Sequence, residues 1–84
     1  MFQVFIEPSV MKRLNKLDEG LRLRLLHRIK ELRDFPETRL DVKKMHGAED
    51  IFRLRVGEWR IIFHVFWESK EIVIFDLDTR GRVY

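Results

Sequence analysis

The sequence has 84 residues, of which 45% are hydrophobic and 37% are charged, and its formal net charge is +3. This length fits a single domain over residues 1–84, and the hydrophobic content excludes an intrinsically disordered chain. The absence of cysteine excludes disulfides, a thiolate nucleophile and a cysteine-based zinc site. No run of about 20 apolar residues occurs, so no membrane span or membrane partner is expected. The lack of a basic signal-peptide start then predicts a cytoplasmic location.

The first half of the chain predicts one strand and two helices. Alternating apolar residues indicate a strand over residues 2–6, and a helix over residues 9–17 follows, with Ser9 as its expected N-cap. A second helix is expected over residues 21–35, because leucine and isoleucine recur at helical spacing and Pro36 then stops it. The two helices should form an antiparallel hairpin.

The second half predicts a β-meander. Strands are expected over residues 51–56, 59–67 and 71–78, joined by compact turns, with a shorter strand over residues 42–45 before them. Short turns between successive strands indicate antiparallel pairing. The sequence therefore predicts an α+β fold: an N-terminal strand, a helical hairpin and a meander, with the helices packed on one face of a twisted sheet.

Strand alternation sorts the meander side chains onto two faces. One face is apolar and is expected to pack against the helices. It holds Phe52, Leu54, Val56, Trp59, Ile61, Phe63, Val65, Trp67, Val73, Phe75 and Leu77. The open face is expected to gather the charged residues Arg53, Arg55, Arg60, His64, Asp76 and Asp78. The same parity places four apolar residues on the open face, namely Ile62, Phe66, Ile72 and Ile74. Exposed apolar side chains beside charges suggest that a protein partner docks there.

The cations of this chain suit a phosphate ligand. Eleven of the 17 basic residues are arginine, whose guanidinium binds phosphate through two parallel hydrogen bonds. Such groups could bind a phosphodiester and stabilise the charge that develops during its cleavage. RNA can be cut without a metal, because its own 2′-hydroxyl attacks the adjacent phosphate while a base and an acid move the protons. Residues 80–84 add two arginines and a tyrosine that could stack on a base.

Plainer interpretations stay open from composition and spacing. Arg53 and Arg55 could pair with Asp76 and Asp78 across the sheet, and His64 could be a surface or interface histidine. The three histidines lack a metal-ligand spacing, and no phosphate-binding loop or dinucleotide motif occurs. Neither a metal nor a cofactor is therefore expected.

Three segments carry a family resemblance. Residues 42–47 read Val-Lys-Lys-Met-His-Gly, residues 52–63 read Phe-Arg-Leu-Arg-Val-Gly-Glu-Trp-Arg-Ile-Ile-Phe, and residues 77–84 read Leu-Asp-Thr-Arg-Gly-Arg-Val-Tyr. With the order of predicted elements, they make the whole chain resemble the RelE/ParE toxin superfamily, and the ending is most similar to archaeal RelE toxins. The resemblance implies a toxin that inhibits translation as a ribosome-dependent endoribonuclease. Its implied partners are the ribosome, messenger RNA and a RelB-like antitoxin.

The resemblance also implies roles for individual residues. Arg60 would stabilise the phosphate, Arg80 would be the second essential arginine, and Tyr84 would stack on or orient the substrate. Substrate binding is further expected of Arg53, Arg55, Arg82 and Lys44.

The general base is not fixed by the resemblance. Several relatives have a histidine directly before the terminal arginine, where this chain has Thr79. Arginine stays protonated and is a poor base, so Lys44, His64 and an electrostatically assisted 2′-hydroxyl all remain candidates. Two alternative functions also remain: a ParE-like toxin that poisons DNA gyrase, and a non-catalytic binding module of the same fold.

Overall fold

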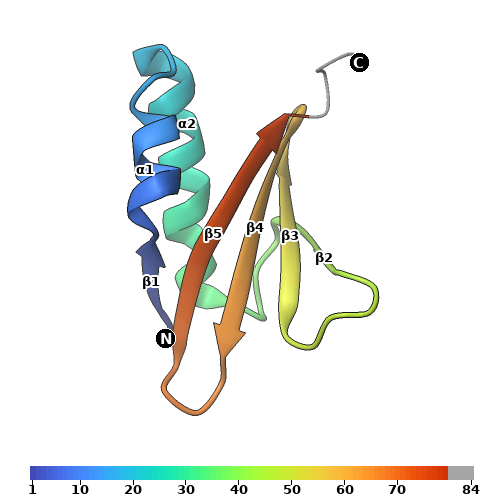
Figure 1. Ribbon diagram of the computed structural model, residues 1–84. Coiled ribbons are helices and arrows are strands. Elements are labelled where there is room, and N and C mark those ends of the chain that lie inside the picture. The colour runs from blue at the N-terminus through green and yellow to red at the C-terminus, as the bar shows by residue number, and fades with distance from the viewer. Residues whose placement is uncertain (80–84) are drawn as a thin grey trace.

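A five-stranded mixed sheet forms the centre of the computed structural model, which describes residues 1–79 (Figure 1). The strand order across the sheet is β1-β5-β4-β3-β2. The strands are β1 (Gln3–Ile6), β2 (Asp41–Lys44), β3 (Ile51–Val56), β4 (Trp59–Phe66) and β5 (Glu71–Thr79). The helices are α1 (Pro8–Leu14), α2 (Glu19–Lys30) and the short 3₁₀ helix η1 (Glu31–Asp34). The α+β class and the antiparallel meander of β3, β4 and β5 are confirmed.

Both helices cover one face of the sheet, as predicted (Figure 1). They bury side chains at helical spacing, Val10 and Leu14 from α1 and Leu25 and Ile29 from α2. The sheet contributes Leu54, Val56, Ile61, Phe63, Val65, Ile72, Ile74 and Leu77 to the same core. No helix among residues 1–79 is long and apolar enough to span a membrane.

The first helix begins earlier than the sequence suggested, and Ser9 is not its N-cap. Pro8 is the first helical residue, and the extended Glu7 (φ −61°, ψ 144°) is the cap position. Proline fixes φ near its helical value and lacks an N–H that this position could not satisfy within the helix, so it favours the first helical position. The second helix likewise begins at Glu19, so Gly20 lies in its first turn.

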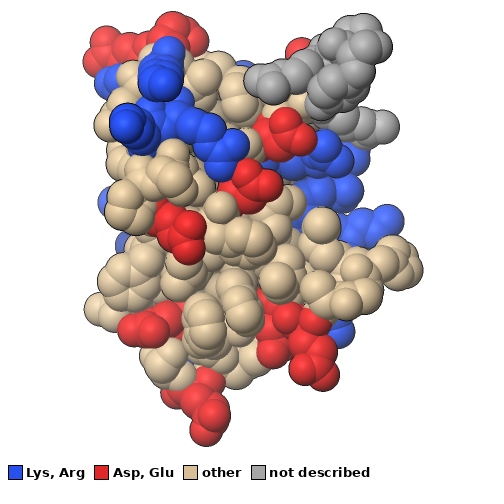
Figure 2. All heavy atoms as spheres, viewed as in Figure 1, with Lys and Arg blue, Asp and Glu red and all other residues tan. Residues whose placement is uncertain are grey.

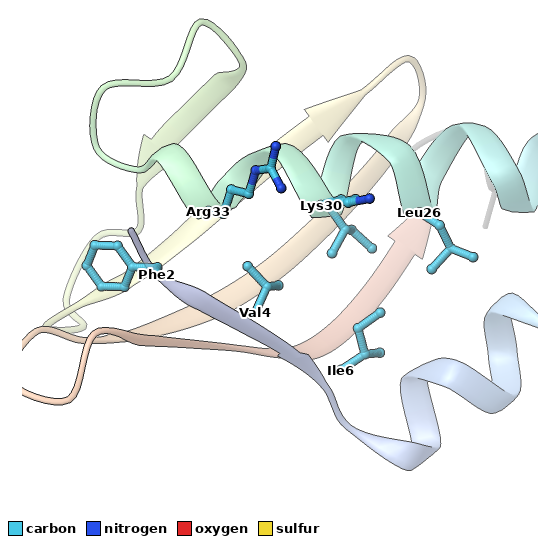
Figure 3. A pocket seen from close by; sticks show the side chains of 7 residues that line it. Phe2, Val4, Ile6, Leu26, Lys30 and Arg33 are labelled. Atoms are coloured by element: carbon cyan, nitrogen blue, oxygen red, sulfur yellow. The ribbon is translucent and has the colours of Figure 1, made fainter.

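The strand β1 pairs in parallel with β5, from Gln3 opposite Glu71 to Ile6 opposite Ile74. A shallow groove of about 360 Å³ separates β1 from α2. Figure 3 shows the apolar side chains of Val4 and Leu26 lining this groove. Among residues 1–79, none of the predicted site residues lines it.

A bulge in β5 overturns the predicted parity of the residues that precede it in that strand. Ile72 and Ile74 were expected on the open face, yet both are fully buried in the core. The register with β4 shifts between the pairs Ile62–Asp76 and Phe63–Ile74, so Phe75 is an extra residue. An extra residue resets the two-residue alternation. The core therefore takes Ile74 and Leu77, while Phe75 is half-buried.

Trp67 also departs from the prediction that it belongs to the buried apolar set. Its side chain remains 41% exposed. The ring contacts Phe2 and Phe35 at centroid distances of 5.8 and 5.6 Å, and Nε1 donates a 2.8 Å hydrogen bond to Asp50. Trp67 thus closes the edge of the aromatic core, because its indole N–H needs a polar partner at the surface.

Candidate functional site

Three arginines lie together on the sheet face that the helices leave open. Arg55 and Arg60 are directly opposite each other in the β3–β4 register, and Arg53 is opposite Ile62. Successive side chains alternate across a sheet, so all three share the face opposite to buried Leu54 and Ile61. We call Arg53, Arg55 and Arg60 the arginine cluster.

The Nε atoms of all three arginines in the cluster are buried and have no hydrogen-bond partner among the described residues. A buried N–H without an acceptor costs free energy, more so when the group is charged. Charged guanidinium groups with free donors are suited to an anion that supplies the acceptors. The cluster is therefore ready to bind phosphate or carboxylate oxygens.

The aspartates of β5 do not pair with Arg53 and Arg55, so that alternative interpretation is wrong. Arg60 Nη2 lies 3.0 Å from Asp78 Oδ2, and Arg13 of α1 lies 2.8 Å from Asp76 Oδ1. Within residues 1–79, no ion pair involves the other two members of the cluster.

A groove of about 360 Å³ adjoins the cluster and is lined by Lys43, Lys44, Met45, His46, Arg53, Arg60 and Ile62. Lys43 pairs with Arg53 in the β2–β3 register, whereas Lys44 pairs with Phe52. By strand alternation Lys43 shares the face of the cluster, and Lys44 has the parity of the helix-covered face. Sequence reasoning missed Lys43 as a site residue. Strand alternation from the apolar Val42 would have placed it on the open face.

His64 lies apart from the cluster. It is four residues along β4 from Arg60, about 13 Å at the usual rise per strand residue. Its ring stacks on Phe66 with a centroid distance of 4.3 Å and an interplanar angle of 25°. Phe66 is 42% exposed, and the half-buried Ile62 and Val73 continue this open-face apolar patch. The structure thus brings together Arg53, Arg55 and Arg60 but separates them from His64.

The remaining predicted residues, Arg80, Arg82 and Tyr84, lie outside the described residues. They follow β5, whose Asp78 pairs with Arg60. Figure 2 shows Lys and Arg atoms gathered along the right-hand edge of the molecule, beside the upper ends of the meander strands. Among residues 1–79, no group of three histidine, aspartate or glutamate side chains could hold a metal ion.

Comparisons with known proteins identify the family of this chain and agree with its fold. Residues 4–84 match the model of a family described as the ParE toxin of the type II toxin–antitoxin system parDE. The RelE1 protein of Methanocaldococcus jannaschii is 27% identical over 79 residues, which cover 94% of this chain and 78% of that protein.

Solved structures repeat the fold. A chain of the archaeal RelE–RelB complex from Pyrococcus horikoshii OT3 superposes with a TM-score of 0.81 and is 34% identical in sequence. The match covers 98% of this chain and 98% of that one. The isolated RelE toxin of E. coli superposes with a TM-score of 0.79 at 16% identity, covering 99% of this chain and 88% of that one. The latter likeness concerns the fold alone.

Proposed function

Because this chain belongs to the ParE toxin family of type II toxin–antitoxin systems, we propose that it acts as a RelE-type toxin that cleaves messenger RNA on the ribosome. The observation that carries the proposal is the arginine cluster: three guanidinium groups share one open sheet face, and within residues 1–79 no ion pair involves Arg53 or Arg55. The named relatives are RelE proteins, which favours RNA cleavage over the poisoning of DNA gyrase.

In the proposed reaction the RNA supplies its own nucleophile. The 2′-oxygen attacks the adjacent phosphorus, the bond to the 5′-oxygen breaks, and a 2′,3′-cyclic phosphate and a 5′-hydroxyl result. Arg60 donates hydrogen bonds to the non-bridging oxygens, whose negative charge grows in the transition state. Arg80 is the proposed second phosphate ligand, and Tyr84 stacks on a neighbouring base. No step requires a metal ion.

The proton of the 2′-hydroxyl needs an acceptor. Lys44 lines the groove beside Arg53 and Arg60, whereas His64 does not line it. Lining this groove favours Lys44 over His64 as the proposed base, and Lys43, which shares the face of the cluster, and His46 are further candidates in the same groove. Arg53, Arg55 and Arg82 bind the RNA backbone in this proposal, since their guanidinium groups stay protonated and serve as donors.

A RelB-like antitoxin is the proposed inhibitor. The crystallised archaeal relative comes from a RelE–RelB complex. On this chain the exposed Phe66 and the half-buried Ile62 lie on the same open face as the arginine cluster. An antitoxin segment with apolar and acidic side chains would fill that patch and neutralise the arginines, which would block access to RNA.

The decisive experiment maps RNA 5′ ends in a cell-free translation extract, with and without ribosomes. The wild-type toxin should produce new ends inside translated messages only when ribosomes are present. Arg60→Ala and Arg80→Ala should each reduce cutting by roughly 10²-fold, as removal of one transition-state donor does. Arg33→Ala is the matched control, because this exposed arginine lies away from the cluster. Unchanged cutting by Arg60→Ala would refute the site, and inhibition of supercoiling with intact translation would refute the function.

A further inference from the structure

A second cationic groove lies between α2 and the end of β3. Its volume is about 500 Å³, and it is lined by Arg24, Arg28, Glu31, Arg39, Leu40, Asp41, Arg55, Val56 and Gly57. We call it the α2–β3 groove. Four guanidinium groups from three separate parts of the chain therefore line one depression, against two carboxylates.

Gly57 allows one of these arginines to lie close to the backbone. It adopts φ +61° in the turn between β3 and β4, and a Cβ built there would lie 2.7 Å from Arg24 Nη2. The positive φ favours glycine at this position, and an added Cβ would displace the end of the Arg24 side chain. The Arg24 guanidinium thus lies beside the turn that follows Arg55 and Val56.

The internal partners of this groove do not neutralise it. Arg28 pairs with Glu31 at 3.3 Å, and both side chains are more than a third exposed, so the pair is weak. Within residues 1–79, no ion pair involves Arg24, Arg39 or Arg55. Arg55 Nε is in addition buried without an acceptor. The groove keeps a surplus of free donors and positive charge.

The lining identifies the kind of ligand. A protein partner would be anchored by apolar or aromatic side chains, but the groove offers only Leu40 and Val56, and Val56 is 7% exposed. Several converging guanidinium groups instead match the oxygens of successive phosphates. Of the arginine cluster only Arg55 lines this groove, whereas Arg53 and Arg60 line a different one, so a strand held at Arg53 and Arg60 does not fill it. We propose that the α2–β3 groove binds the phosphodiester backbone of folded RNA outside the strand that is cut. This inference rests on the proposed function, in which that RNA belongs to the ribosome.

Salt-dependent binding tests the proposal without any cleavage. The probe is a 2′-O-methylated RNA hairpin, which lacks the attacking hydroxyl, and fluorescence anisotropy gives its affinity over a range of salt concentrations. Each phosphate contact contributes nearly one to the slope of log affinity against log salt. The triple variant R24Q/R28Q/R39Q should therefore reduce the magnitude of the slope by nearly three relative to wild type.

The matched control is K12Q/R22Q/R33Q, which removes the same charge from helix positions outside the groove. It should leave the slope within about one of wild type. The single variant Arg39→Gln changes an exposed residue outside the helices and strands, so it tests the groove if the triple variant does not fold. It should lower the slope by about one.

Two outcomes separate this inference from the proposed function. If Arg60→Ala abolishes cutting while the triple variant binds RNA like the control, the groove proposal is wrong and the nuclease proposal stands. If Arg60→Ala cuts RNA normally but the triple variant shows the predicted reduction in salt dependence, the groove proposal is supported and the nuclease site is wrong. A triple variant that loses affinity for polyglutamate, yet keeps the RNA slope, would instead identify an acidic-protein site and overturn the proposal.

Discussion

Arg60 and Asp78 are directly opposite each other on β4 and β5, and the Arg60 guanidinium donates to the Asp78 carboxylate at 3.0 Å. Both side chains are more than a third exposed, so water screens the pair and its contribution to stability is at most about 1 kcal/mol. The pair matters more for binding, because the carboxylate occupies donors that a phosphate would use and also repels the phosphate.

Asp78→Asn should therefore strengthen RNA binding. The amide oxygen can still accept the hydrogen bond that the Thr79 N–H now donates to Asp78 Oδ1. Loss of one negative charge beside the phosphate should raise the affinity for a 2′-O-methylated single strand about three- to tenfold at low salt. Anisotropy titrations measure this, with exposed Asp34→Asn as the control. A weaker affinity would mean that Asp78 holds Arg60 in its binding orientation.

Gly57→Ala should disturb both the turn and the α2–β3 groove. Gly57 (φ +61°) and Gly47 (φ +75°) both adopt left-handed backbone, where alanine costs about 1–2 kcal/mol. At Gly47 no atom lies within 4 Å of an added Cβ, so Gly47→Ala isolates the backbone cost. Only Gly57→Ala should also displace Arg24 and lower the RNA salt slope by about one. Urea unfolding and the hairpin titration measure the two effects, and equal slopes would contradict the role of Gly57.

The β5 bulge can be tested by stability. Ile74 is fully buried whereas the preceding Val73 is half-buried on the open face. Ile74→Ala should lower the free energy of unfolding by about 2–5 kcal/mol, through lost burial and the cavity that remains. Val73→Ala should cost under about 1.5 kcal/mol. Denaturant midpoints check both values. A larger loss of stability for Val73→Ala than for Ile74→Ala would contradict the bulge and favour the regular register predicted from the sequence.

Arg13 connects α1 to the bulge through two hydrogen bonds from one guanidinium. Nη1 donates to the Leu77 carbonyl at 2.6 Å and Nη2 to Asp76 Oδ1 at 2.8 Å. Lysine has no fork that reproduces this geometry. Arg13→Lys should cost about 0.5–1 kcal/mol of stability, a small value because the side chain is about half exposed. Thermal melts of Arg13→Lys against exposed Lys12→Arg test this, and equal melting temperatures would argue against the connection.

Sequence reasoning located most of the fold because polarity alternates cleanly along β3 and β4. Leu54, Ile61 and Phe63 are buried as that alternation predicts. It was wrong for the first half of β5, because the bulge at Phe75 carries no glycine or proline that would reveal it. The start of α1 was wrong for a different reason: Ser9 has the chemistry of an N-cap, but Pro8 is better suited to the first helical position.

The candidate site was likewise predictable from the sequence only in part. The shared face of Arg53, Arg55 and Arg60 follows from parity within two regular strands. The α2–β3 groove could not be predicted, because it depends on the rotation of α2 against the sheet and on the path of residues 36–40. Neither the rotation nor the path is encoded in a local pattern, so nothing in the sequence indicates that Arg24 and Arg39 line one groove.

The parallel pairing of β1 with β5 joins segments from opposite ends of the described chain. During synthesis β1 leaves the ribosome long before its partner exists, so its edge must wait until residues 71–74 have emerged. The helices cannot seal their core any sooner, because Ile72 and Ile74 are part of it. A chain with this topology cannot complete its sheet and core until β5 has been translated.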